Sequence, residues 1–159
     1  MRLPHEERLE LAGEAGRLEV VLNVPPHCNG LALIAHPHPL YGGTLDNKVV
    51  QTLTKSLYGQ GLVAVRMNFR GVGQSDGVYD EGRGETDDWL RVAHAMQSRF
   101  ADLPVTLAGF SFGAFVISQV AYRLRAKHLL LVGPAINRFP LEHVPPGTLV
   151  VHGEEDDVI

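Results

Sequence analysis

The sequence predicts an α/β fold: a three-layer, mostly parallel sheet with helices on both faces and an antiparallel hairpin at its N-terminal edge. Short apolar runs of strand length alternate along the chain with segments whose apolar residues recur at helical spacing. Strands that alternate with helices form βαβ units, which give parallel sheets with right-handed crossovers. Two strand-like segments, 8–11 and 17–24, flank the Gly-containing turn 12–16 and predict the hairpin. The length of 159 residues fits a single domain, 1–159.

The first half of the chain predicts two strands and two helices after the hairpin. Residues 31–35 form a continuous apolar run, which is typical of a strand buried on both faces. The next helix is predicted to begin with Asp46 as its N-cap and to end at Gly59 and Gly61. Residues 62–69 predict a strand, and the polar turn 70–77 separates it from a helix that is predicted to begin near Thr86.

The second half predicts three further strands of the parallel sheet. Residues 104–108 form the first of them, and a helix follows at 114–124. Strands at 128–132 and 148–152 are joined by the Pro-rich connection 133–147. Because this connection contains no inserted cap, we expect an open site.

The most informative motif is Gly109-Phe-Ser111-Phe-Gly113, which lies where an apolar strand turns into a helix. A serine on such a sharp turn is lifted above the edge of the sheet, and a Cβ at either glycine would strike a neighbouring strand or helix. Ser111 is therefore a candidate nucleophile.

A serine hydroxyl also needs a base, a carboxylate that orients the base, and N–H donors for an oxyanion. The residue after the nucleophile, Phe112, is one candidate donor. The loop His36-Pro-His-Pro-Leu-Tyr-Gly-Gly43 should supply the second. Since proline has no N–H, His38 and Leu40 are the candidates in this loop. The carboxylate is expected after the last strand, in His152-Gly-Glu-Glu-Asp156-Asp157.

Four motifs in the same order resemble those of the α/β-hydrolase superfamily, in particular a small, lid-poor branch close to the dienelactone hydrolases. They are the loop that begins at His36, the turn Asn68-Phe-Arg-Gly-Val-Gly-Gln-Ser-Asp-Gly77, the Ser111 turn, and the segment 152–156. The resemblance implies that Ser111 is the nucleophile, Asp156 the triad acid with Asp157 as the alternative, and Phe112 and the loop at His38 the oxyanion donors. It implies a serine hydrolase of esterase type, which acts on a small ester or related acyl substrate through an acyl-enzyme and needs no cofactor.

The sequence departs from the family pattern at its C-terminus. In this superfamily the order is Ser, Asp, His, and the histidine follows a further helix and strand. The sequence ends at Ile159, so we expect a C-terminally truncated hydrolase that lacks the catalytic histidine, the last strand and the last helix. The alternative function is a non-catalytic fragment or binding module that has lost the general base.

Composition argues against several other partners. The net charge of -4 and the absence of a basic run disfavour nucleic acid and anionic membranes, and no apolar segment has the length of a membrane span. We expect a soluble, cytoplasmic protein, and the sequence does not define its oligomeric state. Cys28 is the only cysteine, which excludes an intrachain disulfide and a cysteine-based zinc site.

Other residues have a functional and a structural interpretation, and we favour the structural one. His36 and His38 lack a third ligand at a suitable spacing, so loop shaping is expected rather than metal binding. Gly71-Val-Gly73 is not followed by the helix of a dinucleotide-binding loop. His152 is expected to pack structurally rather than to act as the base. Asp87 and Asp88 are expected to be first-turn helix charges, and Arg70 is expected to pair with an acid within its own turn.

Overall fold

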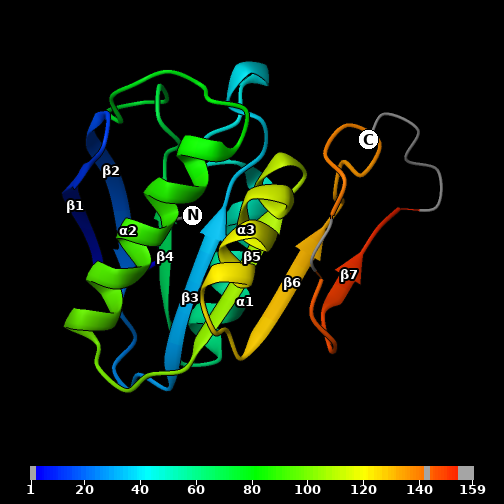
Figure 1. Cartoon of the computed structure of the whole chain (residues 1–159). Helices are drawn as coiled ribbons and strands as arrows, with labels where there is room; N and C mark the ends of the chain where they lie inside the picture. Colours follow the sequence, from blue (N-terminus) through cyan, green and yellow to red (C-terminus); the bar gives the residue numbers. More distant parts are fainter. Residues whose placement is uncertain (1–2, 142–143, 154–159) are drawn as a thin grey trace.

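The computed structural model describes residues 3–141 and 144–153, in which seven strands form one sheet in the order β1-β2-β4-β3-β5-β6-β7 (Figure 1). The strands are β1 (Glu6–Gly13), β2 (Gly16–Asn23), β3 (Gly30–Ala35), β4 (Leu62–Met67), β5 (Val105–Phe110), β6 (His128–Val132) and β7 (Leu149–Val151). The β1–β2 and β2–β4 pairs are antiparallel, and every other pair is parallel. The predicted fold class, with a hairpin at the N-terminal edge, is confirmed.

Helices cover both faces of the sheet, as three-layer packing requires. The helices are α1 (Lys48–Gly59), α2 (Arg83–Arg99) and α3 (Phe112–Arg123), with a short 3-10 helix, η1 (Pro39–Tyr41), after β3. Helices α2 and α3 lie together on one face, and α1 lies on the other (Figure 1). Within the described residues, no helix is both long and apolar enough to cross a membrane.

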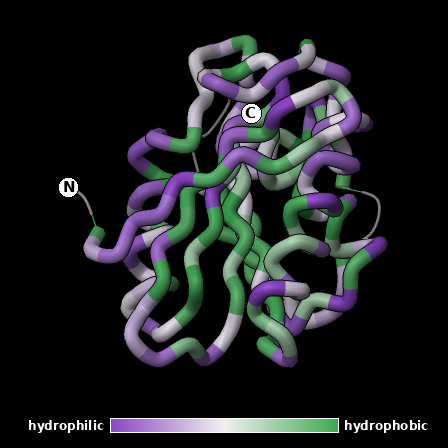
Figure 2. The backbone as a smooth tube through the Cα atoms, turned by 90° about the vertical axis from the view of Figure 1, so that its left-hand side faces the viewer, coloured by the Kyte–Doolittle hydropathy of each residue, from purple (hydrophilic) through white to green (hydrophobic). Residues whose placement is uncertain are grey.

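Alternating side chains of the central strands build a core on each face of the sheet. Leu31 and Leu33 of β3 belong to the larger cluster beneath α2 and α3, whereas Ala32 and Ile34 belong to the smaller cluster beneath α1. All six residues of β3 are buried, as its continuous apolar run predicts. Figure 2 shows hydrophobic residues along these inner strands and hydrophilic ones on many of the outer loops.

Three predicted helix starts are wrong. Helix α3 begins at Phe112, two residues before the predicted start at 114. Asn47, not Asp46, caps α1, because its side-chain oxygen accepts hydrogen bonds from the N–H groups of Val49 (2.9 Å) and Val50 (3.2 Å). Helix α2 begins at Arg83, three residues before Thr86. Its start is stabilised by Glu85, a buried carboxylate that accepts a hydrogen bond from the N–H of Gly82 at 3.0 Å.

The predicted roles of Arg70 and Asp88 are also corrected. Asp88 lies in the second turn of α2 and is fully buried, so it is not a first-turn surface charge. Arg70 pairs with Asp88 and not with an acid in its own turn: Nε and Nη2 donate to the two carboxylate oxygens at 2.8 and 2.9 Å. This bidentate pair ties the turn after β4 to α2. Asp87, its neighbour, makes an exposed pair with Arg123.

The turn that contains Arg70 is also tied to the hairpin. The backbone N–H of Arg17 donates to Asp76 at 2.7 Å, and the N–H of Glu19 donates to the Ser75 hydroxyl at 2.9 Å. The Ser75 hydroxyl in turn donates to the carbonyl of Asn68 at 2.7 Å. The motif 68–77 therefore has a structural role here: it holds the ends of β2 and β4 together.

Candidate active site

Ser111 lies on a strained turn between β5 and α3. Its φ of 57° and ψ of -118° place a non-glycine residue at positive φ, which costs on the order of 1–3 kcal/mol. Its N–H donates to the carbonyl of Val132 at 3.0 Å, which ties the turn to the end of β6. The Ser111 side chain makes no capping hydrogen bond to α3 although it occupies the N-cap position. The hydroxyl is therefore not committed to holding the helix.

The glycines on both sides of Ser111 are required by close backbone contacts. A Cβ on Gly109 would lie 2.4 Å from the carbonyl oxygen of Gly113 in α3. A Cβ on Gly113 would lie 2.4 Å from the carbonyl oxygens of Ala35 and His36, at the end of β3. A side chain at either glycine would therefore collide with the neighbouring helix or strand, as the motif predicts.

Phe112, the residue after Ser111, holds the turn in place through its buried ring. It is the first residue of α3, its side chain is fully buried, and its ring packs against His38 and Phe139 at centroid distances of 4.8 and 5.0 Å. No hydrogen bond from its backbone N–H is found within the described residues. An N–H in the first turn of a helix lies at the positive end of the helix dipole, which favours a developing negative charge.

The loop after β3 brings the ring of His38 into contact with Phe112. The His38 ring is engaged at both nitrogens: Nδ1 accepts from the N–H of Leu40 at 3.2 Å, and Nε2 lies 3.2 Å from the hydroxyl of Tyr79. Because Nδ1 accepts, the proton is on Nε2, and the ring is neutral. Burial, with the Arg138 charge as a smaller contribution, lowers the pKa of His38. The Leu40 N–H is thereby committed to a hydrogen bond inside its own loop.

His36 is buried and connects the segment after β3 to the segment after β4 by hydrogen bonds. Its Nδ1–H donates to the carbonyl of Pro37 at 2.7 Å, and its Nε2 accepts from the N–H of Phe69 at 3.0 Å. Burial lowers the pKa of His36 to about 4, so the ring is neutral near pH 7. Both nitrogens are used, which agrees with the predicted loop-shaping role.

A cleft of about 380 Å³ opens beside Ser111. Its lining is mainly aromatic and apolar, with one cation at the exposed Arg138. Besides Ser111 it consists of Pro37, His38, Tyr41, Phe112, Ala135, Arg138 and Phe139. The structure thus brings Ser111, Phe112 and His38 to one cleft, while Leu40 is outside its lining.

Sequence reasoning missed Tyr41, Tyr79, Arg138 and Phe139. Tyr41 ends the short 3-10 helix η1, and Arg138 and Phe139 lie in the connection after β6. Hydrophobic periodicity carries no signal in such short or irregular segments, and only the fold places these residues near Ser111. Asp156 and Asp157 lie outside the described residues. His152, which follows β7, is exposed, so the prediction that it packs structurally is wrong. The described residues include no group of three or more His, Cys, Asp or Glu residues that could hold a metal ion.

A mostly parallel sheet with a serine on a tight strand-to-helix turn defines the α/β-hydrolase class of fold. Comparisons with known proteins agree with this. Residues 41–146, more than half of the chain, match the family model described as serine aminopeptidase, S33.

Solved structures match over the whole chain. An α/β serine hydrolase without a lid from Xanthomonas campestris has a TM-score of 0.93 and 34% identity, covering 100% of this chain and 76% of that one. An α/β serine hydrolase homologue from Coxiella burnetii has a TM-score of 0.89 and 38% identity, covering 100% and 79%.

A curated relative, an uncharacterized protein from Rickettsia prowazekii, is 34% identical over 137 residues. The match covers 81% of this chain, and the chain spans only 58% of the length of that relative. The chain belongs to the α/β-hydrolase superfamily, in the family described as serine aminopeptidase, S33.

Proposed function

We propose that this chain supplies the nucleophile and the oxyanion donors of a serine hydrolase that acts on a small ester or related acyl substrate. The observation that supports this most strongly is the turn at Ser111. Its backbone is strained, its two glycines are required by backbone contacts near 2.4 Å, and its hydroxyl is not used to cap α3. Strain of this kind persists at functional sites because it presents a reactive group.

In this mechanism the Ser111 hydroxyl oxygen attacks the acyl carbon of the substrate as a base removes its proton. The carbonyl oxygen becomes an oxyanion, which accepts hydrogen bonds from the backbone N–H groups of Phe112 and His38. Collapse of the tetrahedral intermediate expels the alcohol, which takes up the proton, and leaves an acyl group on Ser111. Attack by water then releases the acid and restores the serine.

We assign the second oxyanion donor to His38 rather than Leu40. The Leu40 N–H already donates to His38 Nδ1, so it would have to break that bond before it bound an oxyanion. Leu40 is also 64% exposed and does not line the cleft. His38 follows Pro37 directly, and its ring contacts Phe112.

We assign the general base to a histidine that follows the acid in the full-length protein. His38 has both ring nitrogens engaged, and His36 is buried with both of its nitrogens engaged, so neither offers a free lone pair to Ser111. The superfamily order, in which the histidine follows the acid, supports this assignment. Asp156 is the proposed acid that orients the base, with Asp157 as the alternative.

The cleft supports a small substrate with an apolar acyl part. Half of its lining residues are aromatic: His38, Tyr41, Phe112 and Phe139. Its volume of about 380 Å³ is at the small end of ligand sites, which span roughly 300–1,000 Å³.

Hydrolysis of p-nitrophenyl acetate and butyrate by the full-length protein tests the proposal. We expect Ser111→Ala to reduce kcat by at least about a thousandfold, because the oxyanion contacts alone retain only a small part of the rate enhancement. Ser56→Ala, at an exposed serine of α1, is the matched control and should leave kcat unchanged. Full activity in Ser111→Ala would exclude Ser111 as the nucleophile.

A further inference from the structure

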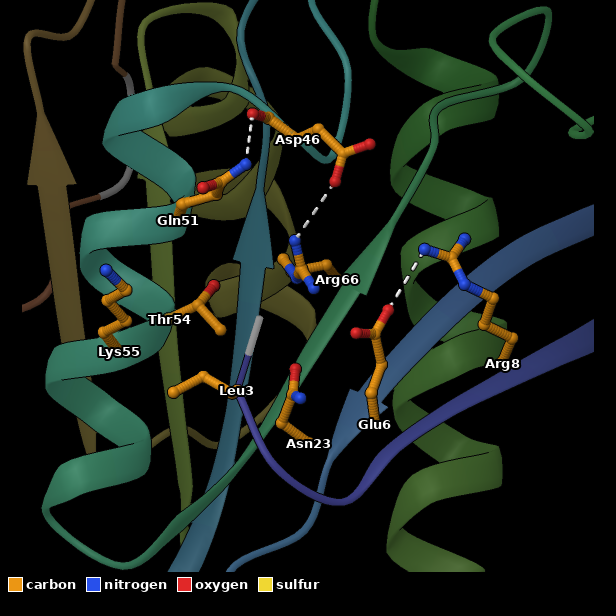
Figure 3. Close-up of a pocket in the computed structure, with 9 residues that line it drawn as sticks. All are labelled: Leu3, Glu6, Arg8, Asn23, Asp46, Gln51, Thr54, Lys55 and Arg66. Atoms are coloured by element: carbon orange, nitrogen blue, oxygen red, sulfur yellow. Dashed lines mark hydrogen bonds and ion pairs between the residues drawn. The ribbon is translucent and has the colours of Figure 1, made fainter. Parts of the chain in front are cut away.

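A second pocket of about 240 Å³ lies on the α1 side of the sheet, away from the Ser111 cleft (Figure 3). Its floor is formed by Asn23, the last residue of β2, and by Arg66 of β4. Helix α1 contributes Gln51, Thr54 and Lys55. Leu3 lies before β1, and Glu6 is the first residue of that strand. The pocket shares no lining residue with the Ser111 cleft.

The floor of this pocket contains buried polar atoms without partners. Asn23 is 1% exposed, and neither its side-chain nitrogen nor its oxygen makes a hydrogen bond. Arg66 is 7% exposed, and its Nε–H is also unpaired. Burying a polar group without a hydrogen bond is costly, so such groups in native proteins usually have a protein, water or ligand partner. In this pocket the side chains of Asn23 and Arg66 both contain a buried polar atom that has no such partner among the described residues.

The charge of Arg66 is also poorly compensated. Its Nη1 donates to the carbonyl of Leu45 at 3.0 Å, but its carboxylate partner Asp46 is 3.6 Å away and 67% exposed. Burial lowers the pKa of Arg66, against the opposing influence of Asp46. A buried cation normally requires a close anion and several hydrogen bonds. The Nε–H of Arg66 still lacks an acceptor among the described residues.

Among the other charged residues of the pocket, Lys55 is the cation whose charge is uncompensated in the part of the chain that the structure describes. Arg8 and Glu6 pair with each other at 3.0 Å (Figure 3). No carboxylate partner of Lys55 is found within the described residues. Arg8 also pairs with Glu19 at 3.6 Å, so its charge is compensated, whereas Arg66 has only the exposed Asp46 and Lys55 has no such partner in the described part of the chain.

We propose that this pocket binds a phosphate group, as free phosphate or as a small phosphomonoester. Arg66 Nε, Asn23 Nδ2 and Lys55 Nζ are donors for its oxygens. Asn23 Oδ1 needs a donor, and a phosphate that retains one proton supplies it, whereas sulfate and carboxylate carry no proton at neutral pH. The volume exceeds the roughly 30 Å³ of one water severalfold, so the pocket accepts a polyatomic group.

Access to the floor involves Leu3. In Figure 3 Leu3 lies beside Thr54 and Asn23 at the pocket, and the unpaired Asn23 atoms are shielded from solvent. The phosphate therefore reaches the amide as the Leu3 side chain moves aside. Leu3→Ala should consequently tighten phosphate binding and not weaken it.

The test is calorimetric titration and thermal unfolding of the full-length protein with inorganic phosphate, glycerol phosphate and sulfate at constant ionic strength. We expect saturable binding of at least one phosphate compound and weaker binding of sulfate, and the tighter phosphate compound identifies the source. Lys55→Gln should raise the Kd about tenfold, because a charge-assisted hydrogen bond is lost. Asn23→Asp should abolish binding by placing a carboxylate on the floor.

Lys48→Gln is the matched control: it removes an exposed lysine from the same helix, outside the pocket. It should leave the Kd unchanged. The proposal is overturned if phosphate does not bind, if sulfate binds equally well, or if the Lys55 and Lys48 variants bind phosphate with the same Kd. Lys55→Gln changes a partly exposed side chain, so the comparison remains available even if Asn23→Asp does not fold.

Discussion

Acid should destabilise this protein through His36. Its pKa is about 4 in the folded protein against an ordinary value of 6.5, because burial disfavours the charged ring. The unfolded chain therefore binds a proton first as the pH falls. The contribution of the neutral ring is fully present above about pH 6.5 and is lost progressively down to about pH 4.

The size of the effect follows from the shift of the His36 pKa. Each unit corresponds to about 1.4 kcal/mol, so the complete loss is on the order of 3 kcal/mol. Between pH 7.5 and pH 5, proton binding to an unfolded histidine reduces the free energy of unfolding by about 2 kcal/mol. That is a large fraction of the roughly 5–15 kcal/mol by which a whole domain is stable.

Urea unfolding at pH 7.5, 6.5 and 5.0 measures this loss, with His36→Gln as the comparison. The variant should have a lower free energy of unfolding at pH 7.5 and a decrease toward pH 5 that is smaller by about 2 kcal/mol. His38, Glu7 and Asp76 also have lowered pKa values and act in the same direction, but they are present in both proteins. An identical pH dependence in both proteins, or an NMR titration of His36 near pH 6.5, would refute the reasoning.

Three further predictions concern the turn, the buried ion pair and the acid. Gly113→Ala should destabilise the protein by about 1–3 kcal/mol or more in urea unfolding, because its Cβ would collide with two carbonyl oxygens. The control Gly59→Ala, whose Cβ would meet nothing within 4 Å, should not destabilise it. Equal effects of the two substitutions would show that the close contacts of Gly113 do not matter for stability. Asp88→Asn should lower the free energy of unfolding by roughly 3–5 kcal/mol, because it leaves Arg70 buried without its anion. Asp87→Asn, at the exposed pair with Arg123, should lower it by less than about 1 kcal/mol. A small effect at Asp88 would show that the buried pair is dispensable. Asp156→Asn should reduce kcat on p-nitrophenyl esters of the full-length protein by about 10⁴, and a loss seen only with Asp157→Asn would identify the neighbour as the acid.

Local patterns predicted the elements that depend on local physics. The apolar run at β3, the hairpin and the Ser111 turn were all visible in the sequence, because burial on both faces, turn chemistry and close backbone contact each restrict residue types. The close contacts of Gly109 and Gly113 are the physical cause of that last pattern. Residue spacing therefore placed the candidate nucleophile, Ser111, and a candidate oxyanion donor, Phe112, on this turn.

Pairings between distant residues were not predictable in the same way. Asp88 lies 18 positions from Arg70, and at a helix start it resembles an ordinary surface charge. Likewise Asn23 and Arg66 become neighbours only because β2 pairs with β4. The N-cap of α1 at Asn47 and the starts of α2 at Arg83 and of α3 at Phe112 differed from prediction by one to three residues, because local sequence signals fix helix boundaries only to within a few residues.

Covalent labelling of the full-length protein with a fluorophosphonate probe, followed by peptide mapping, tests whether Ser111 is the nucleophile. We expect one adduct per chain, on the peptide that contains Ser111, and loss of the adduct in Ser111→Ala but not in Ser56→Ala. An adduct at another serine, or unchanged labelling of Ser111→Ala, would show that the strained turn between β5 and α3 does not carry the nucleophile.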